Sequence, residues 1–173
     1  MPSFNKDISA GEVVWDVDGT PLSFSPFMGG INVAVSHTTA DVKRDSFGTT
    51  PYDKVITGGE VIVTIPISEA DSARIEKIAG ITKGTNQHKI TGYSGLALRA
   101  LAKKVYIKPI VNGVTSTTES EWCIIPLATP PVLKATQVFS GEGDQRVINC
   151  ELYGLPATET GFVGVVFSFG ENT

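Results

Sequence analysis

The chain is 173 residues long, which is the size of one domain, and we expect a single domain over residues 1–173. Its 18 Val, 18 Thr and 15 Ile favour β-structure, while 18% charged and 41% hydrophobic residues exclude a disordered polyelectrolyte. No apolar run approaches the ~20 residues that span a bilayer, and the first residues lack a secretory signal, so we expect cytoplasmic expression and no membrane segment.

The N-terminal third predicts short strands joined by turns. Residues 13–17 and 22–25 flank Asp18-Gly19, a dipeptide typical of hairpin turns. Residues 31–36 alternate between apolar and polar or small side chains, which predicts a half-buried strand with its apolar residues pointing inward: Ile31, Val33 and Val35.

Residues 40–59 show no sustained apolar period. They contain Gly48, Pro51 and the Gly58-Gly59 pair, all typical of loops, so we expect a connection of about 20 residues. A loop of that length is either functional or disordered, and we expect it to reach another subunit. The residues assigned to this contact are Lys43, Arg44, Asp45, Gly48, Thr49, Thr50, Pro51 and Asp53.

The middle of the chain predicts one strand and two helices. Residues 60–67 alternate with Val61, Val63, Ile65 and Ile67 on one face. Ser68 is then placed to cap a helix that runs to Gly80. Residues 93–104 are rich in helix formers, which predicts a second short helix that leads into a strand over residues 105–111.

The C-terminal part predicts further strands over residues 122–127, 132–139, 146–153 and 162–169, and Asn112-Gly113 indicates a hairpin before them. Strands therefore cluster before and after a central helical stretch instead of alternating with helices. That order favours an α+β, mainly β class: an antiparallel β-sandwich or barrel with one or two short helices.

The charge is unevenly distributed along the chain. Residues 77–118 carry seven basic and no acidic side chains, +7, and the remaining residues carry −11. Such a basic stretch could bind nucleic acid, but Tyr93 and Tyr106 are its only aromatic residues. We favour docking of this stretch on acidic surface of another copy, with Lys103, Lys104 and Lys108 as the basic assembly surface.

No residue pattern indicates catalysis, a metal site or a cofactor site. Asp16-Val-Asp18-Gly19-Thr20 matches the signature of Mg²⁺-dependent haloacid-dehalogenase-like phosphatases, but a second strand follows it where that chemistry requires a helix. His37 and His88 are too few for a triad or a zinc site. Cys123 and Cys150 occupy strand-like positions, and we expect two reduced thiols, with a disulfide as the alternative.

Three segments resemble the tail tube (major tail) proteins of long-tailed bacteriophages. The first, residues 45–71, contains Gly48-Thr-Thr-Pro-Tyr-Asp53 followed by a Gly59-Glu60 strand and an acidic helix start. The second, residues 94–110, has a short helix and a Leu/Val-rich strand with a proline, and the strand Gly19-Thr-Pro-Leu-Ser-Phe24 with Gly30 fits the same template. The resemblance covers residues 12 to 110, and residues 111–173 match in strand pattern alone.

This resemblance implies a non-enzymatic virion protein with a tail-tube-like fold. It implies hexameric rings whose inner sheets join edge to edge and that stack into a tube, assembled in the host bacterial cytoplasm and located in the virion tail. The implied lumen contents are the tape measure protein and duplex DNA, without tight binding, and further implied partners are sheath, baseplate and terminator proteins. The alternatives are a tube protein of another contractile injection or secretion machine, or the phosphatase described above.

Overall fold

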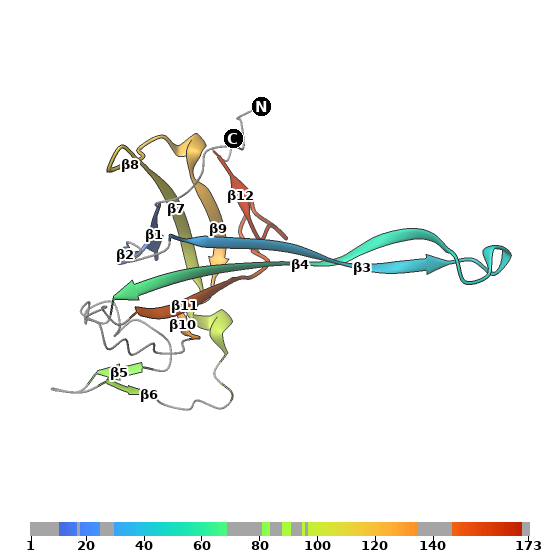
Figure 1. The fold of residues 1–173 in the computed structure, drawn as a ribbon, viewed down its shortest axis with the longest axis horizontal. Coiled ribbons are helices and arrows are strands. Elements are labelled where there is room, and N and C mark those ends of the chain that lie inside the picture. The colour runs from blue at the N-terminus through green and yellow to red at the C-terminus, as the bar shows by residue number, and fades with distance from the viewer. Residues whose placement is uncertain are drawn as a thin grey trace, which may run out of the picture.

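The computed structural model describes residues 11–16, 18–24, 30–68, 81–83, 88–90, 95, 97–134 and 147–170. These residues form twelve strands and three 3₁₀ helices (Figure 1). The strands are β1 (Gly11–Trp15), β2 (Leu22–Phe24), β3 (Asn32–Lys43), β4 (Pro51–Ser68), β5 (Ile81–Lys83), β6 (His88–Ile90), β7 (Lys103–Val111), β8 (Val114–Thr115), β9 (Cys123–Ala128), β10 (Val132–Leu133), β11 (Val147–Gly154) and β12 (Ser168–Phe169). The 3₁₀ helices are η1 (Asp45–Phe47), η2 (Leu98–Leu101) and η3 (Glu119–Glu121).

Ten strands form one antiparallel sheet that folds over on itself. Its main path is β2-β1-β7-β9-β11-β4-β3, with β8, β10 and β12 paired alongside, and β5 pairs with β6 separately. In Figure 1, β1, β7 and β9 run upright, whereas β3, β4 and β11 cross them. The two halves join where Gly154 pairs with Ala128. This is the mainly β, antiparallel sandwich predicted from the sequence.

The core lies between the two halves of the folded sheet. The predicted alternation in β4 is confirmed, because Val61, Val63, Ile65 and Ile67 are all at most 2% exposed. Side chains of β1, β7, β9 and β11 complete the same cluster. Cys123 and Cys150 are free and buried in it, and burial raises the pKa of the Cys123 thiol to about 11 and of the Cys150 thiol to about 12.

Two predicted hairpins are confirmed. β1 pairs with β2 across the turn that contains Asp18-Gly19. β7 pairs with β8 across Asn112-Gly113, where both residues have positive φ, 52° and 79°. A tight hairpin turn of this kind needs that left-handed backbone at both central positions, which explains the Asn-Gly sequence.

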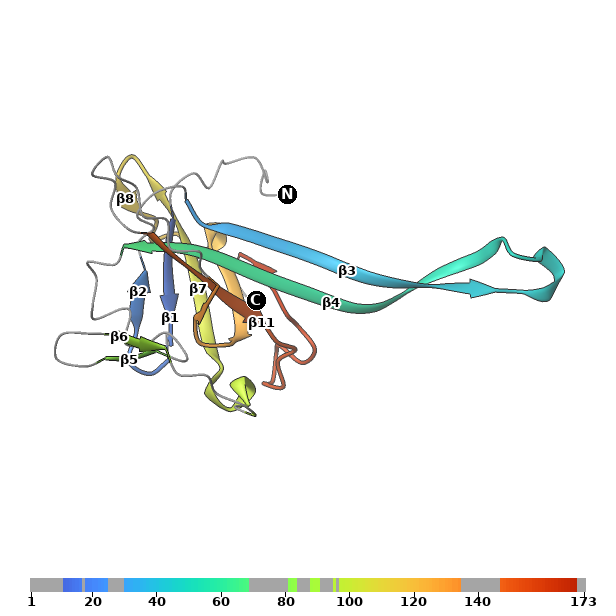
Figure 2. The ribbon, with the colours of Figure 1, turned by 60° about the horizontal axis from the view of Figure 1, so that its bottom comes forward.

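The predicted loop over residues 40–59 is wrong. β3 and β4 continue beyond the sandwich as a two-stranded ribbon that projects far from the body (Figures 1 and 2). We call residues His37 to Gly59 the arm. Its strands escape detection because both faces are in solvent, so no apolar period marks them.

Several smaller predictions also need correction. The helix over residues 93–104 is absent from its described part: residues 98–101 form only η2, and Lys103 already begins β7, because pairing with β1 and β9 overrides helix propensity. Val35 is 50% exposed, since it lies where β3 leaves the sandwich. The last predicted strand is confined to Ser168–Phe169, and turns occupy the residues before it.

The predicted helix over residues 68–80 lies outside the described residues, apart from Ser68, which ends β4. β9 and β11 occupy the strands predicted over 122–127 and 146–153. Of the strand predicted over 132–139, β10 accounts for the first two residues, and residues 135–139 are not described.

Candidate assembly interface

The arm is exposed to solvent along its whole length. Every described side chain from Ala34 to Glu60 is exposed. Four large apolar side chains lie on the arm itself: Val42 at 38%, Tyr52 at 52%, Val55 at 49% and Ile56 at 64% exposure. An isolated two-stranded hairpin is marginally stable in water, which makes the exposed ribbon a candidate surface for contact with another molecule.

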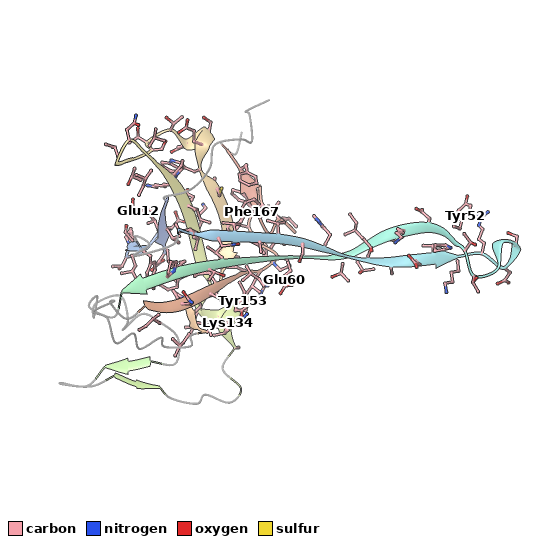
Figure 3. The ribbon with its side chains drawn as sticks, in the orientation of Figure 1. Glu12, Tyr52, Glu60, Lys134, Tyr153 and Phe167 are labelled. Atoms are coloured by element: carbon pink, nitrogen blue, oxygen red, sulfur yellow. The ribbon has the colours of Figure 1, made fainter. Side chains whose placement is uncertain are left out.

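The residues predicted to make the inter-subunit contact are gathered at the end of the arm. Lys43 ends β3 and Pro51 begins β4, and η1 with the turn around Gly48, at φ 61°, connects them. The guanidinium of Arg44 lies 4.2 Å from the ring centroid of Tyr52. Figure 3 shows Tyr52 near the far end of the arm, well away from the sandwich.

An exposed ion pair joins the two strands just before the tip. Asp41 and Lys54 are opposite each other in the ladder, and their side-chain oxygen and nitrogen are 3.6 Å apart. Ala40 lies opposite Val55, on the other face of the ribbon. The two faces of the arm therefore differ in chemistry, one charged and one apolar at this level.

The three predicted basic residues lie on β7 and contact groups of their own chain. Lys103 pairs with Asp16 at 3.5 Å and Lys104 with Asp18 at 3.6 Å. The ammonium of Lys108 lies 4.2 Å from the ring centroid of Trp122. Two of the basic side chains therefore contact the β1–β2 turn, and the third contacts the Trp122 ring. The ion pairs are open to solvent, because the Lys103 and Asp18 side chains are 47% and 69% exposed.

The Asp16-to-Thr20 segment forms a structural turn. Asp16 has φ 59°, and its Oδ2 accepts a hydrogen bond from the Thr20 N–H at 3.3 Å. β1 has antiparallel neighbours on both sides, which is not the parallel strand and helix that the phosphatase signature requires. Within the described ranges, no group of three or more His, Cys, Asp or Glu side chains is placed to hold a metal ion.

A buried carboxylate near the base of the arm was not identified from the sequence. Glu151 accepts hydrogen bonds from Tyr153 Oη at 2.6 Å and from Lys134 Nζ at 2.9 Å. Burial would raise the pKa of Glu151, but these hydrogen bonds and the Lys134 charge outweigh it and hold that pKa below its usual value. The same contacts raise the pKa values of Lys134 and Tyr153.

An open hollow of about 500 Å³ lies beside this cluster. Glu60, Leu98, Arg99, Tyr153 and Pro156 are among its lining residues, and Arg99 donates a hydrogen bond to the Pro156 carbonyl at 3.1 Å. Figure 3 labels Glu60 on β4, Tyr153 on β11 and Lys134 directly after β10, close to where the arm leaves the body. The hollow contains no arrangement of nucleophile, base and oxyanion donor among its described residues.

Neither a known protein-family profile nor a curated protein sequence matches the chain. Among solved structures, the fold is similar to a chain of the PVC sheath-tube complex, an extracellular contractile injection system in its extended state. The TM-score is 0.53 at 13% identity, over 88% of each chain. A chain of the anti-feeding prophage (AFP) baseplate aligns with 11% identity over 83% of this chain and 85% of its own, at a TM-score of 0.41, too low to indicate a shared fold.

The described part of the chain contains no helix with the length and apolar character needed to span a membrane.

Proposed function

We propose that this protein is a structural subunit that polymerises as stacked hexameric rings into a tube and has no enzymatic activity. The observation that carries the proposal is the arm, a long ribbon whose described side chains are exposed on both faces. The fold shared with a chain of a sheath-tube complex agrees with it.

The arm would pack on a second copy, because its described side chains from His37 to Gly59 are all exposed on their own chain. A stable protein interface uses roughly 20–30 residues on each side, and the stretch from His37 to Gly59 is of that size. The predicted contact residues Lys43, Arg44, Asp45, Gly48, Thr49, Thr50, Pro51 and Asp53 occupy its far end, where they would reach a neighbouring subunit or ring. Lys103, Lys104 and Lys108 would add electrostatic attraction between copies.

The tube belongs either to a long-tailed bacteriophage or to another contractile injection machine. In the phage case, the lumen would hold the tape measure protein and pass duplex DNA, and the tube would contact baseplate and terminator proteins at its ends. The particle would be assembled in the host cytoplasm. In a contractile machine, a sheath would surround the tube.

Negative-stain microscopy of the purified full-length protein at rising concentration tests the proposal. We expect rings or tubes of uniform diameter with sixfold symmetry in averaged end views. Monodisperse monomers at the highest attainable concentration would contradict it, as would a reproducible Mg²⁺-dependent phosphatase activity lost in Asp16→Asn.

A further inference from the structure

The body of the molecule holds β4 on both sides as far as Val61. From Val61 to Thr64, β4 pairs with β3 on one side and with β11 on the other. Val61 is 2% exposed, whereas every described side chain from Pro51 to Glu60 is exposed. Beyond Val61, β4 pairs with β3 alone among the described strands, so the direction of the arm depends on the few residues that connect it to the body.

The far part of the arm is a regular ribbon. Its ladder runs from Thr39 to Val42 without a register shift. The exposed ion pair between Asp41 and Lys54 joins the two strands in this part. We call residues 39–56 the outer arm. Because its cross-strand pairs are continuous up to the turn region, the outer arm moves as one piece.

Between the body and the outer arm, the pairing of β4 is interrupted. The first register shift makes Thr57 an extra residue of β4, without a partner in the ladder. A bulge of this kind disrupts the ladder locally and bends its strand. Gly58 and Gly59 come next, opposite Thr38 and His37, and without side chains they make no cross-strand side-chain contact. Three successive residues of β4 therefore lack the contacts that stiffen a ribbon.

Neither the backbone conformation nor the surrounding space requires glycine at these two positions. Neither residue has a φ in the left-handed region that favours glycine. No heavy atom outside the adjacent residues lies within 4 Å of the Cβ position of Gly58, and the nearest to that of Gly59 is His37 Cδ2 at 3.8 Å, an ordinary contact distance. What glycine still supplies is backbone freedom. We infer that Thr57, Gly58 and Gly59 form a hinge about which the outer arm swings relative to the sandwich.

One side-chain hydrogen bond crosses the hinge. The Thr57 hydroxyl donates to the Thr38 carbonyl at 3.1 Å. This bond ties the unpaired residue of β4 to the opposite strand and so limits the swing. Both residues are exposed, so water competes for the same groups and the bond restrains the hinge without fixing it.

A hinge at the base of the arm allows its tip to keep one contact while two bodies change their relative angle. This consequence rests on the proposed function, in which the tip reaches a neighbouring copy. In a stack of rings, the hinge would let the tube bend without losing contacts between copies. A stiff ribbon would instead resist bending.

Distances between spin labels test the hinge in the free subunit. Labels at Thr49→Cys on the tip and Thr158→Cys on the body, both at exposed positions, report the place of the outer arm by double electron–electron resonance. The native thiols of Cys123 and Cys150 are buried, so they react slowly with the label. The labelled protein is measured below the concentration at which it assembles.

Two variants change the hinge in opposite directions. Gly58→Val with Gly59→Ala removes backbone freedom, and we expect the width of the distance distribution to fall by about half. Thr57→Val keeps the β-branched shape but removes the hydroxyl, and we expect the width to rise roughly 1.5-fold. Thr39→Val is the matched control, because the Thr39 hydroxyl has no hydrogen-bond partner among the described residues, and it should leave the width unchanged.

A distribution of equal width in the wild type and in the double glycine variant would overturn the hinge, as would equal widening by Thr57→Val and Thr39→Val. If the double variant does not fold, Gly58→Ala alone gives the same comparison, because its Cβ position is open. Unchanged width together with lost assembly would also overturn the hinge, and would mean that the glycines make room for a neighbouring copy.

The proposed function can fail while the hinge holds. A wild-type protein that stays monomeric, with a distribution that the double glycine variant narrows, would support the hinge and contradict the tube. If tubes form, those of the double glycine variant should be straighter than wild-type tubes in negative-stain images. Tubes of equal curvature would overturn the role of the hinge in bending.

Discussion

Gly154 lies where the two halves of the sandwich join. It ends β11 and pairs with Ala128 of β9. A Cβ atom at this position would lie 3.0 Å from Val166 Cγ1 and 3.1 Å from Val61 Cβ. Both neighbours belong to or pack against the core, so neither can move freely.

We therefore predict that Gly154→Ala destabilises the fold by about 1–3 kcal/mol, as overpacking of a core does. Gly58→Ala is the matched control, because no heavy atom lies within 4 Å of its Cβ position. Urea denaturation of both variants measures the difference. Equal midpoints for the two variants would mean that the sandwich corner has room for a methyl group.

Glu151 gives the fold a dependence on pH. Its pKa in the folded protein is lower than the ordinary value of about 4.3, so its charged form stabilises the folded state. This contribution is complete above about pH 4.3 and is lost as the pH falls through the lower, folded pKa.

We predict that Glu151→Gln lowers the free energy of unfolding at pH 7 by about 1–3 kcal/mol, because Lys134 and Tyr153 lose a charged hydrogen-bond acceptor. The difference from wild type should shrink as the pH is lowered below about 4. Thermal unfolding at a series of pH values measures it, with Glu159→Gln, an exposed carboxylate outside the cluster, as the control. A difference that stays constant down to pH 2 would count against this assignment.

The residues of the core could be read from the sequence, but those of the polar cluster could not. Alternation identifies Val61, Val63, Ile65 and Ile67, because one face of β4 is buried. Glu151 is brought to Lys134 by the pairing of β10 with β11, and no local pattern reports a contact across strands. The same holds for Lys103 and Lys104, whose acidic partners lie in a turn far away in the sequence.

At the scale of elements, the proposed function gives the arm the role of joining folded monomers into an assembly. The body of the sandwich does not depend on it, since the core cluster contains no residue of the arm. Shortening the ribbon should leave the fold intact and remove the surface that is proposed to reach other copies.

We predict that replacing residues 41–54 by Asn-Gly yields a folded protein that does not polymerise. Ala40 and Val55 are opposite each other, so a two-residue turn can close the shortened hairpin there. Circular dichroism and thermal unfolding test the fold, and negative-stain microscopy tests assembly. A collapsed far-ultraviolet spectrum, or tubes like those of wild type, would contradict the role given to the arm.

The arm also shows where element prediction from sequence stops. In the body, β4 is recognisable because one face is buried, whereas in the arm the same strand has Gly58-Gly59 and exposed residues of mixed character. Pairing of β3 with β4 starts in the body and continues outward along the ladder. The ribbon therefore depends on contacts between two strands, and a local sequence pattern does not report such contacts. The expected helix over 93–104 failed for a related reason, since pairing of β7 outweighed local propensity.

At the scale of the whole molecule, the mainly β class follows from composition, but the folding of one sheet into two crossing halves does not.

Charge is a second whole-molecule property, with +7 over residues 77–118 and −11 elsewhere. Within the chain, Asp16 pairs with Lys103 and Asp18 pairs with Lys104, so part of the basic charge is neutralised. The other exposed charges are free to act between copies.

We predict that assembly weakens as salt rises from about 0.05 M to about 0.5 M, because salt screens attraction between exposed charges. The double variant Lys103→Glu with Lys104→Glu should block ring or tube formation. The double variant Lys104→Glu with Asp18→Lys exchanges the two charges and restores the ion pair within the chain. It therefore distinguishes a loss of attraction between copies from a loss of the ion pair that holds the β1–β2 turn. Loss of assembly in the exchange variant would place the effect between copies, and recovery would place it in the β1–β2 turn. Assembly that is indifferent to salt would contradict the electrostatic contribution.

The charge distribution also bears on how the tube would treat DNA. A protein surface that binds duplex DNA neutralises phosphates with free Lys and Arg side chains, and its affinity falls steeply with salt. Here the charges of Lys103 and Lys104 are partly offset by Asp16 and Asp18, and the chain as a whole carries −4. A conduit for a polyanion must avoid such binding, so we predict that assembled tubes show no measurable affinity for duplex DNA at physiological ionic strength. Fluorescence anisotropy with a labelled duplex, at low and physiological salt and with assembled and isolated protein, measures this. Tight, salt-sensitive binding by the isolated protein would instead make the basic stretch from Lys77 to Lys108 a nucleic-acid surface.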